Sequence, residues 1–317
     1  MPPARCHVSL SAQQPLLMPT LRSRAILAVI ALSLGCHSDS TAPHQLCTGL
    51  RLLYTERTES GSTTIVAANA DGSGRAVVVP SGMGATAAAW SPDGCRIAYL
   101  AGQKLYLANA DGSAATPIYS APAALDYPSW SPDGHQLLFV QDPGLGARVW
   151  RINADGSSPA ALTADTLTMT SPSWSSDGTL IAFGRSMSKL QTTPFELVVT
   201  NANGTNARVI ATNVGQGAAW APGTHRLAYI TASIVGGFEL RTVTSDAADD
   251  RLVVAMPYSA LDIAWAPAGD SLFFAAVAPT SNPPGTSWNL DVVASGGNGL
   301  HQIVAGAPFV QRPSVRR

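Results

Sequence analysis

The sequence predicts an all-β fold, and within that class a six-bladed β-propeller with four-stranded antiparallel blades. A segment that opens on tryptophan recurs at Trp90, Trp130, Trp174, Trp220 and Trp265, with steps of 40, 44, 46 and 45 residues. A period of about 40–45 residues with a shared tryptophan is typical of propeller blades. The 317 residues also include 28 glycines and 23 prolines and show no long helical period, which favours short strands joined by frequent turns.

Each repeat combines the tryptophan with a tight turn and a second strand. In Ser91-Pro92-Asp93-Gly94 the proline presets φ, the aspartate can bond its own backbone and the glycine tolerates a positive φ. Apolar residues seven and nine positions after each tryptophan alternate with the period of a strand, so we expect them to pack between neighbouring blades. These are Ile97 and Tyr99, Leu137 and Phe139, Ile181 and Phe183, Leu227 and Tyr229, and Leu272 and Phe274.

A third strand follows in each repeat and ends in another turn. Asn-Ala-Asp-Gly, or Asn-Ala-Asn-Gly in one copy, closes the apolar segments that end at Gly72, Gly112, Gly156 and Gly204. Asp-Gly and Asn-Gly between apolar runs are strong hairpin signals, so a fourth and shorter strand should close each unit.

The two ends of the repeat region complement each other. Residues 49–54 match a second strand but lack the innermost strand before it, whereas Gln311–Val315 resembles the innermost strand Asp126–Trp130 with nothing after it. We therefore expect the C-terminal strand to complete the N-terminal blade, which closes a six-bladed ring within residues 46–317 and removes exposed sheet edges.

The first 45 residues indicate export. Arg22 and Arg24 precede an apolar run over residues 25–34, which is too short for a membrane span of roughly 17–25 residues and is typical of a signal peptide. We assign residues 1–35 to this signal, with residues 1–17 as a possible mis-called start because Met18 lies just upstream of the arginines. Residues 36–45 are polar and predict a flexible tether.

The segment Leu32-Ser33-Leu34-Gly35-Cys36 resembles the bacterial lipobox, with Ser33 where that family usually has leucine. The resemblance implies a lipid on Cys36, attachment to the membrane through that lipid only, and a location on the periplasmic side of the outer membrane or at the cell surface. His37 stands where an aspartate would signal retention in the inner membrane. A simple secreted protein cleaved nearby is the alternative.

The five repeats together resemble the TolB-like propeller repeat, a relative of the WD repeat, over residues 45–317. The resemblance implies a bacterial envelope protein that binds partners through its propeller. TolB also carries an N-terminal α/β domain for which this sequence leaves no room, so a role in the Tol–Pal system is not implied.

Charge and motifs favour a protein that binds rather than catalyses. With 19 basic and 20 acidic side chains the net charge is −1, which gives no reason to expect nucleic acid. The sequence has no Gly-x-Ser-x-Gly, His-Glu-x-x-His or Cys-x-x-Cys motif, so we expect no catalytic residue, metal or cofactor. We also expect the protein to be a monomer. The alternative is a metal-dependent lyase of the oligogalacturonate type, which some related propellers form. His135 and His225 lie in turns two blades apart.

Innermost strands line the channel of a propeller, and residues three and four positions before each tryptophan, or before Val315, should surround one mouth. Among them we select the polar set Asp126, Tyr127, Thr170, Gln216, Asp262, Gln311 and Arg312. A polar and partly aromatic funnel suits an envelope protein, a peptide segment or a small polar ligand. The alternative is a solvated mouth that binds nothing.

Two further cysteines, Cys47 and Cys95, align with the first turns of adjacent blades. The oxidising compartment outside the cytoplasm permits a disulfide between them. Their separation cannot be derived from sequence, so a bond and two free thiols both remain open.

Overall fold

The computed structural model describes residues 51–57, 61–142, 146–164, 167–186, 195–233, 236–277, 288–307 and 310–316. All of these belong to one compact unit of the chain, residues 41–317. The predicted signal peptide 1–35 and tether 36–45, with Cys36, lie outside the described residues. A single 3-10 turn, Ser81–Met83, is the only helical element in the described ranges, and no helix there could cross a membrane.

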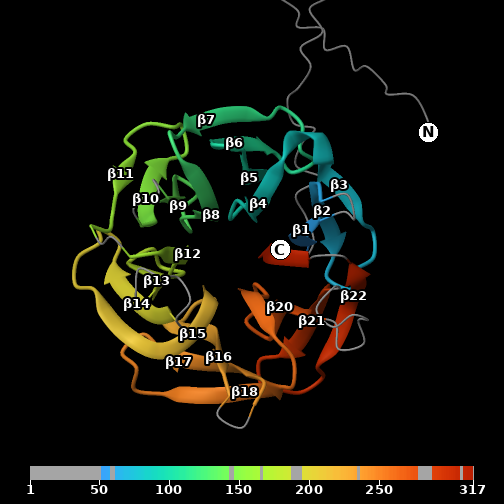
Figure 1. Cartoon of the computed structure of the whole chain (residues 1–317), viewed down its shortest axis with the longest axis vertical. Helices are drawn as coiled ribbons and strands as arrows, with labels where there is room; N and C mark the ends of the chain where they lie inside the picture. The colour runs from blue at the N-terminus through green and yellow to red at the C-terminus, as the bar shows by residue number, and fades with distance from the viewer. Residues whose placement is uncertain are drawn as a thin grey trace, which may run out of the picture. The chain divides into compact units, whose positions relative to one another are not determined.

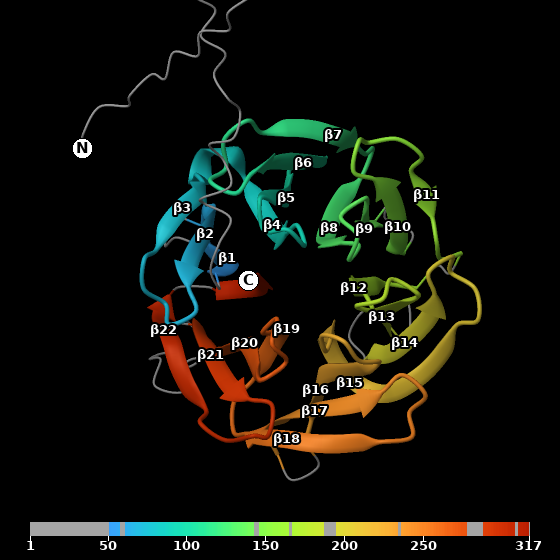
Figure 2. The ribbon, with the colours of Figure 1, turned by 180° about the vertical axis from the view of Figure 1, so that it is seen from behind.

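The described strands form β-sheets that follow one another around a centre (Figures 1 and 2). One sheet has the order β23-β1-β2-β3 and joins the first and last described strands. Its members are β1 (Arg51–Arg57), β2 (Thr63–Asn69), β3 (Ala76–Val79) and β23 (Val310–Arg316). Leu52 pairs with Val315, so the C-terminal strand completes the N-terminal sheet as the sequence predicted.

Three more sheets have four strands each, and one has seven. The four-stranded sheets are β4 (Ala85–Trp90), β5 (Arg96–Ala101), β6 (Lys104–Asn109) and β7 (Thr116–Ser120); β8 (Ala124–Trp130), β9 (Gln136–Asp142), β10 (Arg148–Asn153) and β11 (Ala160–Ala161); and β19 (Ala260–Trp265), β20 (Ser271–Val277), β21 (Trp288–Ala294) and β22 (His301–Ala307). Their antiparallel pairing confirms the predicted propeller with four-stranded antiparallel blades.

The seven-stranded sheet contains β12 (Met169–Trp174), β13 (Leu180–Ser186), β14 (Phe195–Asn201), β15 (Arg208–Trp220), β16 (Arg226–Ala232), β17 (Phe238–Thr244) and β18 (Asp250–Met256). It is continuous because β15 is one long strand. Val214 near its middle pairs with Phe195 of β14 and with Thr231 of β16. Hydrogen bonding therefore joins the described strands into five sheets.

In three repeats, those that begin at Trp90, Trp130 and Trp174, serine and aspartate side chains build the first turn by bonding its backbone. Between β8 and β9, Ser131 Oγ donates to Asp133 Oδ1 over 2.6 Å and accepts from the N–H of Gln136 over 2.9 Å. The N–H of His135 donates to Asp133 Oδ1 over 3.0 Å. The hydrogen bond from Ser131 and then that from His135 hold the pKa of Asp133 below its ordinary value. The carboxylate of Asp133 thus accepts hydrogen bonds from within the turn and stabilises it.

Apolar residues seven and nine positions after each tryptophan are buried, with at most 3% exposure, which confirms their predicted place in the core. They lie between adjacent sheets. Leu100 of β5, for example, shares a cluster with Leu137 and Phe139 of β9. Because one face of a sheet can be covered only by the next sheet, the core continues from sheet to sheet.

The second turn of each repeat packs on the sheet before it. A β-carbon on Gly112, at φ +84°, would overlap the carbonyl oxygen of Val78 in β3. Glycines in the corresponding turns meet a carbonyl of the preceding outer strand in the same way: Gly156 at Ile118, Gly204 at Leu162, Gly297 at Val253 and Gly72 at Ile303. Since Gly72 is in the first sheet and Ile303 in the last, this contact closes the ring.

Gly112→Ala should destabilise the protein more than Gly102→Ala. Both glycines have a positive φ, but a β-carbon on Gly102 would meet nothing within 4 Å. The strain common to both substitutions is about 1–2 kcal/mol, and the overlap with Val78 should add about 1–3 kcal/mol at Gly112. Urea unfolding followed by circular dichroism measures both. Equal losses would show that the turn does not pack on β3.

One carboxyl group is buried between strands. Asp291 of β21 is 5% exposed and accepts a hydrogen bond from the hydroxyl of Tyr258 at Oδ2 over 3.1 Å. Its Oδ1 has no hydrogen-bond partner within the described ranges. Burial raises the pKa of Asp291, and burial together with the charge of Asp291 raises the pKa of Tyr258 to about 12. An ionised Asp291 therefore opposes folding.

Asp291→Asn should stabilise the protein at neutral pH by about 1 kcal/mol, because an amide can accept from Tyr258 without a buried charge. The folded pKa is raised, so the penalty of ionisation is present above the folded pKa and disappears as pH falls toward the unfolded value. The advantage of Asn should shrink over the same range. Thermal unfolding from pH 7 down to pH 4 measures it, with the exposed Asp270→Asn as control. A gain independent of pH would contradict this assignment.

Cys95 is disulfide-bonded. Its predicted partner Cys47 lies outside the described residues, so the pairing remains a prediction. The neighbouring turns are close to one another: a β-carbon added to the glycine of one first turn would contact the proline of the preceding one. The distances would be 3.7 Å from Gly134 to Pro92, 3.4 Å from Gly178 to Pro132 and 3.7 Å from Gly269 to Pro222. In the alignment of repeats, Cys47 stands at the position of these prolines and Cys95 directly follows Gly94.

Candidate functional site

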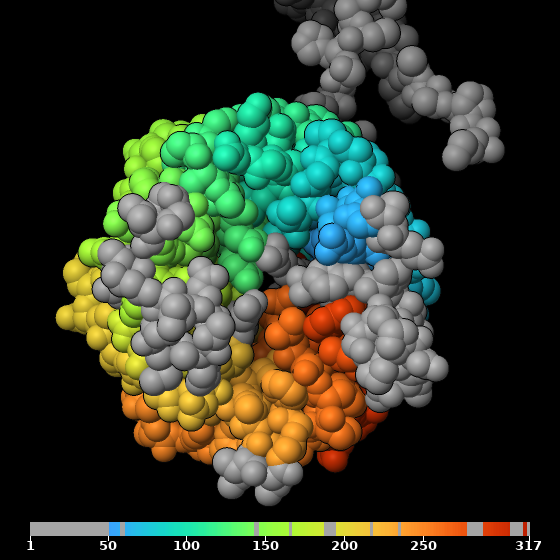
Figure 3. All heavy atoms as spheres, in the orientation of Figure 1, coloured from blue at the N-terminus to red at the C-terminus, as the bar shows by residue number. Residues whose placement is uncertain are grey.

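A cavity of about 550 Å³ lies where the innermost strands of the sheets converge. Residues from the ends of β4, β8, β12, β15, β19 and β23 line it, and the space-filling view shows the surface hollowed at this centre (Figure 3). Strands from both ends of the described chain therefore contribute to one site.

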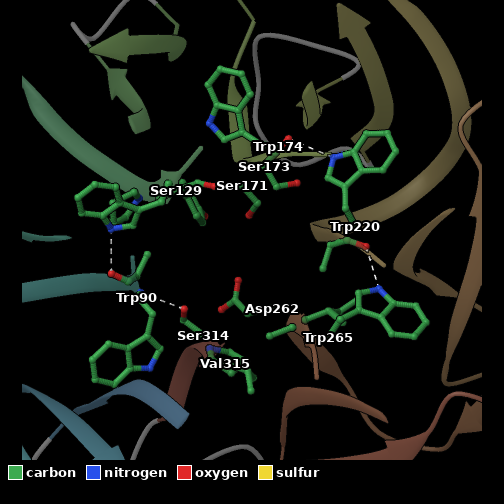
Figure 4. Close-up of a pocket in the computed structure, with 18 of the residues that line it drawn as sticks. Trp90, Ser129, Ser171, Ser173, Trp174, Trp220, Asp262, Trp265, Ser314 and Val315 are labelled. Carbon is green, nitrogen blue, oxygen red and sulfur yellow. Dashed lines mark hydrogen bonds between the residues drawn. The ribbon is translucent and has the colours of Figure 1, made fainter. Parts of the chain in front are cut away.

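Small residues form the narrow wall of the cavity. The position before each tryptophan, or before Val315, carries only alanine or serine: Ala89, Ser129, Ser173, Ala219, Ala264 and Ser314. Ser314 Oγ accepts a hydrogen bond from the N–H of Trp90 over 3.2 Å, which links β23 to β4 (Figure 4). The short side chains keep the centre open.

The tryptophans hold this wall together rather than fill the cavity. The Nε1–H of Trp265 donates to the carbonyl of Ala219 over 3.0 Å, and that of Trp220 donates to Ser173 over 3.1 Å. The Nε1–H of Trp130 donates to Ala89 over 3.3 Å. These three indoles thus reach the innermost strand of the preceding unit, and the labelled indoles point away from the centre in Figure 4.

Three residues at the mouth have an unusual backbone. Tyr127, Ser171 and Asp262 have φ values of 55°, 46° and 44°, and each stands three positions before its tryptophan. The pairing of each innermost strand shifts register at this same place, which is the pattern of a β-bulge. All three residues line the cavity. Because a left-handed φ costs a non-glycine residue about 1–2 kcal/mol, strain is concentrated at this mouth.

The bulges decide which predicted residues reach the cavity. Of the residues that the sequence analysis selected, Tyr127 and Asp262 line the cavity, whereas Asp126 and Thr170 do not. Asp126 Oδ1 accepts from the N–H of Tyr127 over 2.9 Å, and Thr170 is buried against Gly184. The left-handed residue that follows each of these two lines the cavity instead. The side chains of Gln216, Gln311 and Arg312 lie outside the described residues.

Sequence reasoning did not select the serines. Ser171 lines the cavity in the position of Tyr127 and Asp262, and its buried Oγ has no hydrogen-bond partner in the described part of the chain. Ser129 and Ser173 line it one position before their tryptophans. The repeated Pro-Ser-Trp sequence at residues 128–130 and 172–174 was the available signal.

The histidines highlighted by the sequence lie in turns away from this cavity. His225 Nε2 is 2.9 Å from Asp177 Oδ2 in a neighbouring first turn, whereas His135 is exposed in the turn between β8 and β9. Within the described ranges no group of three or more His, Cys, Asp or Glu side chains is arranged to hold a metal ion.

Ser171→Gly should stabilise the protein by about 1 kcal/mol. Glycine removes the left-handed strain of about 1–2 kcal/mol and the unpartnered buried hydroxyl, and its greater freedom in the unfolded chain offsets about 0.5–1 kcal/mol. Equilibrium unfolding in urea measures the change, with Ser173→Gly as the control at a position without positive φ. A loss of stability at position 171 would mean that the bulge is not strained.

The sequence matches the family model of the TolB beta propeller domain over residues 37–269. No curated protein matches the sequence.

Solved structures share the fold at low sequence identity. TolB from Acinetobacter baumannii superposes with a TM-score of 0.69 at 16% identity, over 84% of this chain and 66% of that one. A putative TolB from Agrobacterium tumefaciens gives 0.65 at 14% identity, over 85% and 99% of the two chains. An oligogalacturonate lyase in complex with manganese gives 0.56 at 13%, over 80% and 73%. This chain thus spans just under two thirds of the Acinetobacter protein, and these likenesses concern the fold alone.

Proposed function

Since the chain belongs to the family of TolB β-propeller domains, we propose that it is a non-enzymatic binding protein whose ligand occupies the central cavity. The observation that carries the proposal is the bulge shared by Tyr127, Ser171 and Asp262. Strained backbone at the same position of three innermost strands, with all three side chains on one cavity, is typical of a site shaped for contact. A volume of about 550 Å³ lies within the range of ligand pockets, roughly 300–1,000 Å³.

We also infer that the seven-stranded sheet consists of two blades that share β15, which makes a six-bladed ring. In support, this sheet contains two tryptophans that end innermost strands, Trp174 and Trp220. Trp220 donates to the preceding innermost strand at Ser173, as tryptophans of separate sheets do. Ala247, at φ 63°, takes the turn position that glycine has in the other repeats.

The partner that we propose is an envelope protein or a peptide segment of one, or a small polar ligand. Export by residues 1–35 and a lipid on Cys36 would place the propeller at the periplasmic side of the outer membrane or at the cell surface. The polar tether 36–45, at most about 3.5 Å per residue, would keep it within roughly 35 Å of the bilayer.

A second candidate is a metal-dependent lyase, because the oligogalacturonate lyase shares the fold. Such an enzyme needs several metal ligands at one site. Among the described residues that line the cavity, Asp262 is the one carboxylate and there is no histidine. The observations therefore favour binding, and activity on uronic-acid oligomers that a chelator abolishes would overturn that preference.

Blocking the cavity should remove the partner. We expect cross-linking of the intact envelope, followed by capture of the full chain, to recover specific partners with wild type and not with Ala264→Trp, which places an indole in the narrow wall. Tyr127→Ala, which opens the mouth instead, should also lose them. Val77→Trp adds the same indole to an outer strand, where Val77 is 60% exposed, and should retain them.

The readout is the set of cross-linked proteins identified by mass spectrometry, with thermal unfolding to show that each variant is folded. Retention of the wild-type set by both cavity variants would sink the assignment of the cavity.

A further inference from the structure

We propose that the cavity receives a positively charged hydrogen-bond donor, such as the ammonium group of a lysine in a partner segment, and that Asp262 is its counterion. The inference rests on the proposed function and adds the chemical class of the ligand.

Charge is the first reason. Asp262 is the one charged side chain among the described residues that line the cavity. Its carboxylate points toward the centre in Figure 4, and the bulge at φ 44° sets that direction. A carboxylate in a concave site attracts cations, because the low-dielectric walls focus its field.

The backbone of the wall is the second reason. Innermost strands are sheet edges, so their N–H and C=O groups border the cavity. Three innermost strands have a proline two positions before their tryptophan, or before Val315: Pro128, Pro172 and Pro313. Proline has a carbonyl but no N–H, so these positions offer acceptors without donors. The wall therefore favours a ligand that donates hydrogen bonds.

Side-chain hydroxyls reinforce this preference. Ser129, Ser171 and Ser173 come from two neighbouring innermost strands, β8 and β12, and line the same cavity. A hydroxyl can accept as well as donate a hydrogen bond. An ammonium group has three donors and no acceptor, which matches a carboxylate, hydroxyls and carbonyls.

Shape is the third reason. Only alanine and serine stand directly before the tryptophans and Val315, and carbons of alanine, proline, tryptophan, isoleucine and valine make up much of the rest of the wall. A lysine stem is long, slender and apolar, so it can lie along such a wall while its charged end reaches Asp262.

An anionic ligand is the competing possibility, and it would need a cation at the mouth. Arg312 is the residue that the sequence places there, and its side chain lies outside the described residues. A peptide that carries glutamate in place of lysine therefore separates the two classes of ligand.

The test uses the purified full chain and three amidated, acetylated pentapeptides of glycine with lysine, glutamine or glutamate at the centre. Isothermal titration should give a Kd for the lysine peptide about tenfold below that for the glutamine peptide, as one charge-assisted hydrogen bond implies. Asp262→Asn should abolish this difference. Asp111→Asn removes the same charge from an outer turn, where Asn203 occupies the equivalent position, and should preserve it.

Higher salt should weaken the binding of the lysine peptide selectively. Equal affinities or a preference for the glutamate peptide would each overturn the proposal. If the envelope partner still depends on the cavity while the peptides show no preference, the ligand class is wrong and the binding role stands. If neither depends on the cavity, both are wrong.

Discussion

Every sheet of this protein can cover its faces only with the sheets on either side, and the structure follows from that constraint. The turn of one sheet approaches a backbone carbonyl of the preceding sheet so closely that only hydrogen fits at Gly72, Gly112 or Gly156. Repeated around a centre, this contact makes the last sheet meet the first, where Leu52 and Tyr54 share a core cluster with Phe273 and Leu290. The contact between the last sheet and the first is thus made by the same packing that joins the other neighbouring sheets.

The cavity is a consequence of the same geometry. The innermost strands present an edge to the centre, and an unprotected edge invites another strand. Here prolines remove donors from several edges, bulges interrupt their pairing, and indole N–H groups cover carbonyls such as that of Ala219. The same features that protect the edges also determine which polar groups face the cavity.

The sequence predicted what depends on periodicity. The spacing of tryptophans and the alternation at pairs such as Ile97 and Tyr99 identified strands and core, and the complementary ends identified the partner of β1. The bulges could not be predicted, because a left-handed φ normally signals glycine and these positions hold Tyr127, Ser171 and Asp262. The sequence analysis assumed regular strands without bulges, and for that reason it placed Asp126 and Thr170 at the mouth of the cavity. The continuity of β15 was hidden as well, since Gly215 and Gly217 resemble a linker.

The pairing of β1 with β23 determines when the sheet that contains both ends of the described chain can be completed. Leu52 and Val315 are separated by nearly the entire described chain, and contacts between distant residues are slow to form because a long loop must close first. Until that contact forms, β1 is an open edge and the site at the centre lacks one of its walls. The central cavity is therefore complete only after β23 has paired with β1, so it is among the last features of the fold to form.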